Sequence, residues 1–111
     1  MSMLAEKHCQ PVKKGVQPLT ASQIQEYLLQ LKHSWEVIAS SKIKRKFAFK
    51  DFKEAVAFVN KVAEIAEQEG HHPDIRVFGY KNAEIELSTH SIGGLSENDF
   101  ILASKIELLQ G

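Results

Sequence analysis

The sequence predicts a single α+β domain with the element order α-β-β-α-β-β-α, in which a four-stranded antiparallel sheet carries helices packed on one face. Three observations support this prediction. Residues 52–66 carry apolar side chains at three- and four-residue steps, which is typical of an amphipathic helix. Two pairs of short, strand-like segments flank that stretch. A chain of 111 residues is long enough for one compact domain and short for two.

The N-terminal part of the chain predicts a polar segment followed by a helix. Residues 1–18 are polar and contain two prolines, so we expect an N-terminal tail or loop lying over a domain formed by residues 19–111. Thr20 stands three residues before a glutamine, as in a capping box, and predicts the helix start. We expect this helix to end at His33 and Ser34. Its apolar side chains at helical spacing are Ile24, Tyr27, Leu28 and Leu31.

The next two segments predict a hairpin over residues 35–40 and 42–50, with a tight turn at Ser40 and Ser41. The second strand alternates well, because Ile43, Arg45, Phe47 and Phe49 share one side while Lys42, Lys44 and Lys46 share the other. We interpret the lysine side as a solvated strand face. No aromatic side chains alternate with these lysines to stack on bases, so direct nucleic-acid binding is not expected.

The long helix is the clearest element of the sequence. Asp51 is a good N-cap, and Gly70 stands where a left-handed C-cap is usual. The predicted buried stripe consists of Phe52, Ala55, Val56, Val59, Val62, Ala63 and Ala66.

The remainder of the chain predicts a second strand pair, roughly over residues 75–80 and 83–89, and a final helix. That helix follows two glycines, with Ser96 as its cap and Asp99 reaching back as in a capping box. Its predicted buried residues are Leu102, Ala103, Ile106 and Leu109.

Composition and charge exclude several classes of protein. Fourteen basic and fourteen acidic residues cancel, so no overall field attracts nucleic acid or a membrane. No apolar stretch is long enough for a membrane span, and the charged start of the chain does not resemble a secretory signal. Cys9 is the only cysteine, which excludes an internal disulfide and a cysteine-rich zinc module. We therefore expect a cytoplasmic protein.

Three histidines are the candidates for chemistry. His71 and His72 follow a predicted helix end and precede Pro73, while His90 borders the two glycines. They could be ordinary exposed loop histidines, metal ligands or proton-transfer groups. Adjacent histidines converge poorly on a metal ion, and no carboxylate stands at motif spacing with them. Histidine titrates near neutral pH, so acid–base addition or elimination of water fits these residues better.

Three stretches resemble the pterin-4a-carbinolamine dehydratase family: FAFKDF at 47–52, EQEGHHPD at 67–74 and STHSIGGLSENDFILASKI at 88–106. The resemblance covers nearly the whole chain after residue 18. It implies the same element order. It also implies removal of water from 4a-hydroxytetrahydropterin, or its biopterin form, to give the quinonoid dihydropterin, which recycles the cofactor of aromatic amino-acid hydroxylases. No metal or organic cofactor is implied.

The resemblance also implies residue roles. His71, His72 and His90 match the family's catalytic histidines, with His72 and His90 as general acids toward the hydroxyl. His71 would hold the pterin and handle the ring-nitrogen proton. Asp99 matches an acidic position that orients a histidine or caps the helix. The expected substrate-binding residues are Gly70, His71, His72, Pro73, Ser88, Thr89, His90 and Asp99.

Two positions depart from the family pattern. Many relatives have an acidic residue in place of Gly70 and a tryptophan in place of Ile75, so pterin contacts by those side chains are not expected here. Animal members also stabilise a homeodomain transcription-factor dimer, which makes an interaction or coactivator module the alternative function. The expected partners are a pterin substrate, a second copy in a homodimer or a tetramer, and a functionally linked hydroxylase, with no membrane.

Overall fold

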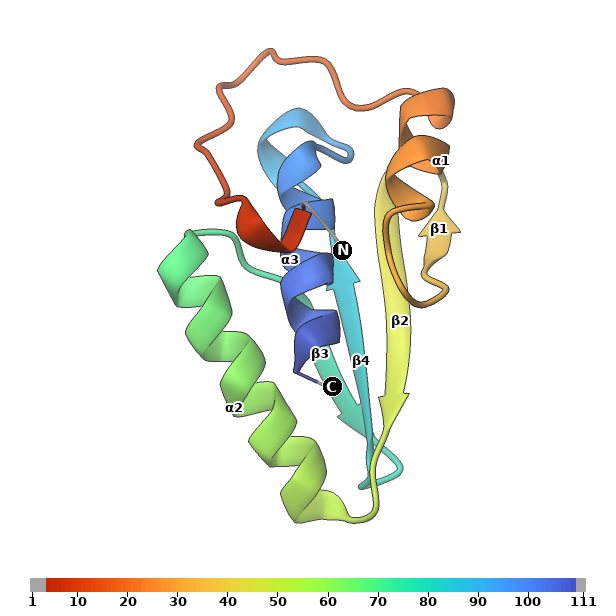
Figure 1. The fold of residues 1–111 in the computed structure, drawn as a ribbon, viewed down its shortest axis with the longest axis vertical. Helices are drawn as coiled ribbons and strands as arrows, with labels where there is room; N and C mark the ends of the chain where they lie inside the picture. The colour runs from red at the N-terminus through yellow and green to blue at the C-terminus, as the bar shows by residue number, and fades with distance from the viewer. Residues whose placement is uncertain (1–3, 110–111) are drawn as a thin grey trace.

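A computed structural model describes residues 4–109, and it confirms the predicted α-β-β-α-β-β-α order with two short 3₁₀ helices added (Figure 1). The helices and strands are η1 (Leu4–Glu6), α1 (Ala21–Leu28), β1 (Glu36–Ile38), β2 (Lys42–Ala48), α2 (Phe52–Glu69), β3 (Asp74–Phe78), β4 (Asn82–Leu87), η2 (His90–Ile92) and α3 (Glu97–Leu108).

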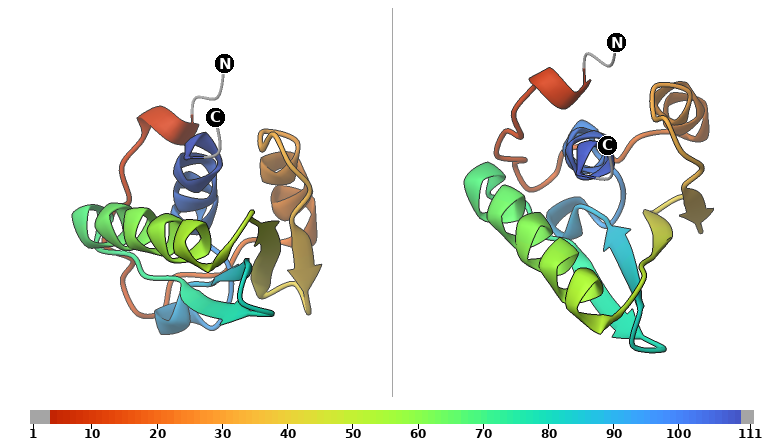
Figure 2. Two further views of the ribbon diagram at one scale, coloured as in Figure 1. Left: turned by 90° about the horizontal axis from the view of Figure 1, so that it is seen from below. Right: turned by 60° about the horizontal axis from the view of Figure 1, so that its bottom comes forward.

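The four strands form one antiparallel sheet in the order β1-β2-β4-β3. Strand β4 lies in the middle, where Ile85 pairs with Arg45 on one side and with Ile75 on the other. Figure 2 shows the three α-helices on the same face of this sheet. The opposite face carries ion pairs between strand lysines and glutamates, such as Lys42 with Glu86 at 3.3 Å.

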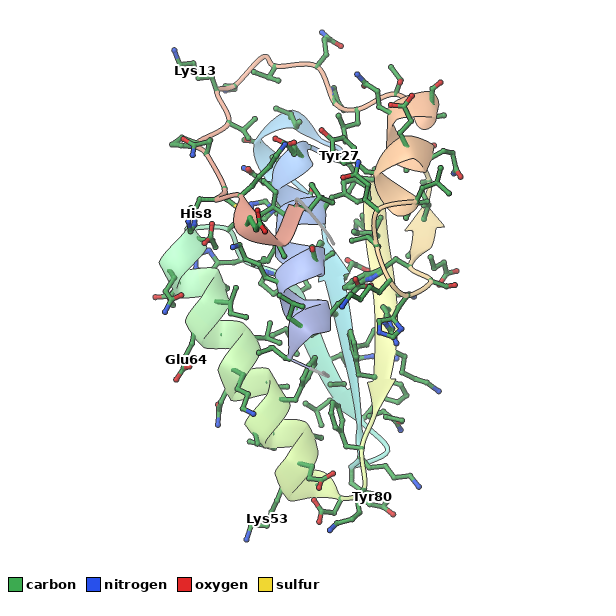
Figure 3. All side chains as sticks on the ribbon, viewed as in Figure 1. His8, Lys13, Tyr27, Lys53, Glu64 and Tyr80 are labelled. Carbon is green, nitrogen blue, oxygen red and sulfur yellow. The ribbon has the colours of Figure 1, made fainter. Side chains whose placement is uncertain are left out.

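Helix α3 lies at the centre of the helical layer, between α1, α2 and η1 (Figure 2). It is therefore buried on nearly all sides, including the polar side chains of Asp99 and Glu107. The aromatic ring of Tyr27 on α1, which is labelled in Figure 3, stacks on Phe100 of α3 at 5.1 Å between centroids. The predicted buried positions of this helix are confirmed at Leu102, Ala103 and Ile106, while Leu109 is partly buried.

The buried stripe of α2 differs from the prediction. Phe52, Val56 and Ala63 are exposed, whereas Phe58 is buried in their place. Helix α2 crosses the sheet obliquely at the β3 edge (Figure 1), so only a narrow face of it meets the core. That face consists of Ala55, Phe58, Val62 and Ala66.

Helix α1 also ends earlier than predicted, at Leu28 rather than at His33 and Ser34. The buried carboxylate of Glu107 accepts hydrogen bonds from the backbone N–H groups of Lys32 and His33, each at 2.9 Å. These bonds draw the chain out of the helix toward β1. The first hairpin turn falls one residue early, with positive φ at Ala39 and Ser40.

The segment before α1 is held against the domain. Leu4 is 1% exposed and belongs to the core, and Lys105 Nζ donates to the carbonyl of Ala5 at 2.9 Å. From there the chain passes the C-terminal end of α2 at His8 and arches over the loop between β4 and α3 (Figures 1 and 3). Its far end is joined to that loop by the hydrogen bond from Leu19 N–H to the carbonyl of Leu95 at 2.8 Å.

Among the described helices, none has the length and apolar character that crossing a bilayer would require.

Candidate active site

Three parts of the chain meet at a cavity of about 420 Å³. The end of α2, the residues after β4 and the N-terminal segment each supply one side of it, and Asn98 of α3 completes the lining. Its lining residues are Cys9, Gln10, Pro11, Val12, Glu69, Gly70, His71, His72, Ser88, Thr89, His90, Ser91 and Asn98.

The end of α2 sets the position of the histidine pair. Asp51 caps the helix start through its hydrogen bond from Glu54 N–H, and Gly70 ends the helix with a left-handed φ of 66°. A residue with a side chain adopts that conformation only at a cost, which explains the glycine. The turn directs the chain away from the helix axis, so His71 and His72 both line the cavity.

His71 is fixed by a buried carboxylate. Its Nε2 atom lies 2.6 Å from Oδ1 of Asp99, and Asp99 is fully buried. The other oxygen of Asp99 accepts from the hydroxyl of Thr89 at 2.8 Å and from the backbone N–H of Ser96 at 3.0 Å. Asp99 is thus both the capping-box residue of α3 and the partner of a histidine.

This network determines which nitrogen of His71 is available to a ligand. A carboxylate is an acceptor, so Nε2 of His71 carries the hydrogen that faces Asp99. Its Nδ1 atom makes no hydrogen bond within residues 4–109. With that hydrogen on Nε2, His71 can offer a lone pair at Nδ1 to a ligand.

The other two histidines are more accessible. Nε2 of His72 lies 2.6 Å from Oε2 of Glu67 on the last turns of α2, and both side chains are more than half exposed. His90 begins η2 and is exposed, and its imidazole has no hydrogen-bond partner among the described residues. Both rings line the cavity and are open to solvent protons.

The remaining predicted residues fall at different distances from the cavity. Gly70, Ser88 and Thr89 line it, whereas Pro73 and Asp99 do not. Asp99 lies behind His71 and acts on the cavity only through that imidazole. Thr89 is 5% exposed, and its hydroxyl is bonded to Asp99 and Ser96.

Several lining residues had no signal in the sequence. Residues 9–12 were expected only to form part of a tail, and Glu69, Ser91 and Asn98 were not singled out. Cys9 N–H donates to Oε1 of Glu69 at 2.7 Å, a contact between residues 60 positions apart. A contact of that kind depends on the folded arrangement and leaves no periodic pattern.

Glu69 and Cys9 have shifted pKa values where they meet. Burial alone would raise the pKa of the Glu69 carboxyl, but the Cys9 N–H, His8 and Lys105 outweigh it and the pKa is lowered. Burial, together with the charges of Glu69 and Asp99, raises the pKa of the Cys9 thiol to about 12. Cys9 is therefore a neutral thiol near neutral pH and is not a nucleophile there.

No group of three or more histidine, cysteine, aspartate or glutamate side chains within residues 4–109 is arranged to hold a metal ion. What the cavity does present is three imidazoles with different surroundings.

The fold and the cavity together define a small α+β protein with a histidine-lined site suited to proton transfer. A family model described as Pterin 4 alpha carbinolamine dehydratase matches residues 17–109. A protein of Rubrobacter xylanophilus, provisionally named a pterin-4-alpha-carbinolamine dehydratase, is 48% identical over 98% of this chain and 100% of its own length. A protein of Nitrosomonas eutropha with the same provisional name is 46% identical over 96% of this chain and 92% of its own. The chain belongs to the pterin-4-alpha-carbinolamine dehydratase family.

Solved structures show the same fold. A transcriptional coactivator/pterin dehydratase from Brucella melitensis aligns with a TM-score of 0.78 and 35% identity, covering 85% of this chain and 99% of that one. A pterin dehydratase-like protein described as a RuBisCO assembly factor in the alpha-carboxysome aligns with a TM-score of 0.61 and 27% identity. That alignment covers 72% of this chain and 93% of the assembly factor.

Proposed function

We propose that this protein is a cofactor-independent dehydratase that eliminates water from 4a-hydroxytetrahydropterin to give the quinonoid dihydropterin. Membership of the family supports the reaction class. The single observation that carries the proposal is that His71, held by the buried Asp99, lines the same cavity as His72 and His90. A cavity of about 420 Å³ is of the size that small-molecule sites usually have.

The reaction requires two proton transfers. One proton is delivered to the hydroxyl on carbon 4a, which leaves as water. Another is removed from the neighbouring ring nitrogen, whose electrons then form the carbon–nitrogen double bond. The substrate supplies all the electrons for this step, so acid and base groups are sufficient.

His71 is the base in this proposal. Asp99 holds its Nε2–H, so its Nδ1 lone pair is directed to a single task, the removal of the ring-nitrogen proton. Asp99 is fully buried, so no solvent competes for its hydrogen bond to His71 and the orientation of the ring is fixed.

His72 and His90 are the acids. Their exposure allows each ring to regain a proton from water between turnovers. They come from different elements, since His72 follows α2 and His90 begins η2. Two acids at separate places on the cavity would serve hydroxyl groups on opposite faces of the flat pterin ring.

The pyrimidine edge of the pterin is assigned to Ser88. The backbone N–H of Thr89 already donates to the carbonyl of Gly94 at 2.8 Å, and its hydroxyl is bonded to Asp99. Ser88 lines the cavity beside it and has a hydroxyl for the pterin amide group. Thr89 then contributes mainly by supporting Asp99, while Gly70 leaves the approach to His71 open.

The proposal includes self-association as a homodimer or a tetramer. It also includes a cytoplasmic location and a functional link to an aromatic amino-acid hydroxylase, whose cofactor the dehydratase would recycle. Strand β3 is at the sheet edge, and exposed apolar side chains stand on α2 and on β3 itself. Phe52 is 54% exposed and Val77 is 37% exposed. Sedimentation of the purified chain would test this, and a monomer at micromolar concentration would contradict it.

The alternative is an interaction or coactivator module built on the same fold. It is supported by the names of the two solved relatives, which describe a transcriptional coactivator/pterin dehydratase and a RuBisCO assembly factor. A module of that kind would need Asp99 only as the capping residue of α3, whereas the enzyme also uses its contact with His71, so that contact favours the enzyme.

The decisive experiment generates 4a-hydroxytetrahydropterin in situ with an aromatic amino-acid hydroxylase and follows the quinonoid product by absorbance, after metal chelation. We expect acceleration by the wild type and a loss of about 10²-fold or more in whichever of His72→Ala and His90→Ala removes the acid on the hydroxyl's side of the ring. The matched control is His33→Ala, because His33 is an exposed histidine that lies outside the cavity. A folded wild type that does not exceed the spontaneous rate would refute the dehydratase and favour the interaction module.

A further inference from the structure

Four consecutive residues of the N-terminal segment, residues 9–12, form one wall of the cavity. We call them the N-terminal wall. They lie outside the part of the chain that matches the family model, which begins at residue 17. The three histidines lie inside the matched part. The histidine side of the cavity therefore lies within the part of the chain that the family model matches, and the N-terminal wall lies outside it.

The N-terminal wall is a built structure and not a loose tail. The amide of Asn98 holds Gln10 in both directions: Gln10 N–H donates to Oδ1 at 3.0 Å, and Nδ2 donates to the Gln10 carbonyl at 2.7 Å. Glu69, whose side chain is 6% exposed, accepts the Cys9 N–H at 2.7 Å. Backbone groups held on both sides in this way fix the position of the wall.

The same two anchors also tie the N-terminal wall to the reactive groups. Glu69 is two residues before His71 on the end of α2, and Asn98 immediately precedes Asp99 on α3. The wall thus has a fixed position relative to the His71–Asp99 pair. It presents the partly buried side chains of Cys9 and Val12, the ring of Pro11, and one amide at Gln10.

The chemistry of the substrate indicates which group would meet this wall. In the bicyclic pterin, the carbon that carries the variable side chain, C6, is bonded to the ring nitrogen that loses its proton, on the side opposite the pyrimidine edge. The C6 side lies at the other end of the ligand, so with the pyrimidine edge at Ser88 we place the C6 substituent against residues 9–12, which line the same cavity from another part of the chain. An apolar surface with a single amide suits a short carbon chain that carries a hydroxyl group.

We infer that the N-terminal wall selects the pterin by its C6 substituent, with Val12 as the main determinant. This inference rests on the proposed function for the placement of the pterin. It assigns substrate selection to a part of the chain that is separate from the three histidines.

Binding of two stable ligands tests the inference without requiring turnover. The ligands are 7,8-dihydropterins that differ only at C6, one with a methyl group and one with a dihydroxypropyl chain, and calorimetry gives the Kd of each. We expect Val12→Trp to weaken the larger ligand about tenfold more than the smaller one, because the indole occupies the space of the longer chain. Val12→Ala adds space, so it should change the ratio of the two Kd values in the opposite direction, in favour of the larger ligand.

The control is Val16→Trp, in the same segment but outside the cavity lining and 49% exposed, which should leave both Kd values unchanged. Circular dichroism checks that each variant is folded. An unchanged ratio of Kd values in both Val12 variants overturns the inference. Wild type that binds both ligands, responds to Val12→Trp and fails to dehydrate any pterin would refute the proposed function alone. Wild type that binds neither ligand would refute both.

Discussion

The imidazole of His71 contacts the carboxylate of Asp99 at 2.6 Å, although 28 residues separate them along the chain. Asp99 belongs to the first turn of α3, where its other oxygen accepts the Ser96 N–H. A helix-capping interaction and a histidine partner are thus combined in one fully buried side chain. The stability of the α3 start and the orientation of the His71 ring are therefore linked.

Asp99→Asn is the first prediction. The amide can no longer accept from every surrounding donor, so His71 loses its fixed tautomer while the cavity keeps its shape. We expect kcat to fall on the order of 10²-fold, and the free energy of unfolding to fall by about 1–3 kcal/mol. Activity as a function of pH separates the two effects, because a purely structural role would leave the pH profile unchanged.

The matched control for Asp99→Asn is Asp51→Asn. Asp51 also caps a helix, accepting the Glu54 N–H at 2.9 Å, but it lies outside the cavity lining. We expect a small loss of stability with kcat and its pH profile intact. Equal losses of kcat in the two variants would contradict the role assigned to Asp99.

Local signals in the sequence predicted the ends of most elements. Thr20, Asp51 and Ser96 begin the three α-helices, and Gly70 ends α2, as predicted. Each of these signals acts within a few residues of the chain, through a capping side chain or a left-handed glycine. That is why they could be recognised without knowing the fold.

Predictions that depended on distant partners were less successful. The α2 stripe was assigned to Val56 and not to Phe58, because periodicity alone does not say which of two neighbouring apolar faces meets the sheet. The early end of α1 depends on Glu107, more than 70 residues away. The three histidines were found as a cluster, but the N-terminal wall, Glu69 and Asn98 were not, for the same reason.

Glu107→Ala is predicted to destabilise the fold without affecting the cavity. The buried Glu107 side chain accepts from Lys32 N–H, His33 N–H and Trp35 Nε1, and Arg45 Nη1 lies 3.9 Å from it. Removal of the carboxylate leaves these donors unpaired, so we expect a loss of about 3 kcal/mol. Urea unfolding monitored by circular dichroism measures it.

Two comparisons make the Glu107 result specific. Glu64→Ala removes an exposed glutamate from α2 and should change stability by less than about 0.5 kcal/mol. The kcat of folded Glu107→Ala should match the wild type, since Glu107 does not line the cavity. A stability loss no larger than that of Glu64→Ala would show that the α1–β1 connection is held by other contacts.

The reactivity of Cys9 reports whether the N-terminal wall is docked. Burial of the thiol is the main reason that its pKa is raised from the ordinary value of 9.0 to about 12. We expect alkylation by iodoacetamide at pH 8 to be at least about 100-fold slower in the folded chain than in urea. Cys9 is the only cysteine, so mass spectrometry gives an unambiguous rate. Asn98→Ala should accelerate the reaction, and equal rates in folded and unfolded chains would mean that the wall is undocked in solution.

The lowered pKa of Glu69 predicts how the free energy of unfolding changes with pH. Burial opposes ionisation, but the Cys9 N–H, His8 and Lys105 outweigh it, so the folded-state pKa lies below the ordinary value of 4.5. Ionised Glu69 therefore stabilises the folded chain above that ordinary value, and the contribution is lost as the pH falls through the folded-state pKa. Glu69→Gln should reduce the free energy of unfolding by about 1–3 kcal/mol at pH 7, and the difference from wild type should shrink toward pH 3.

Urea titrations between pH 3 and pH 7 measure this difference in the free energy of unfolding, with the exposed Glu64→Gln as the control. A difference that grew toward pH 3 would have the wrong sign, and Glu69 would then not be the ionised anchor of the N-terminal wall.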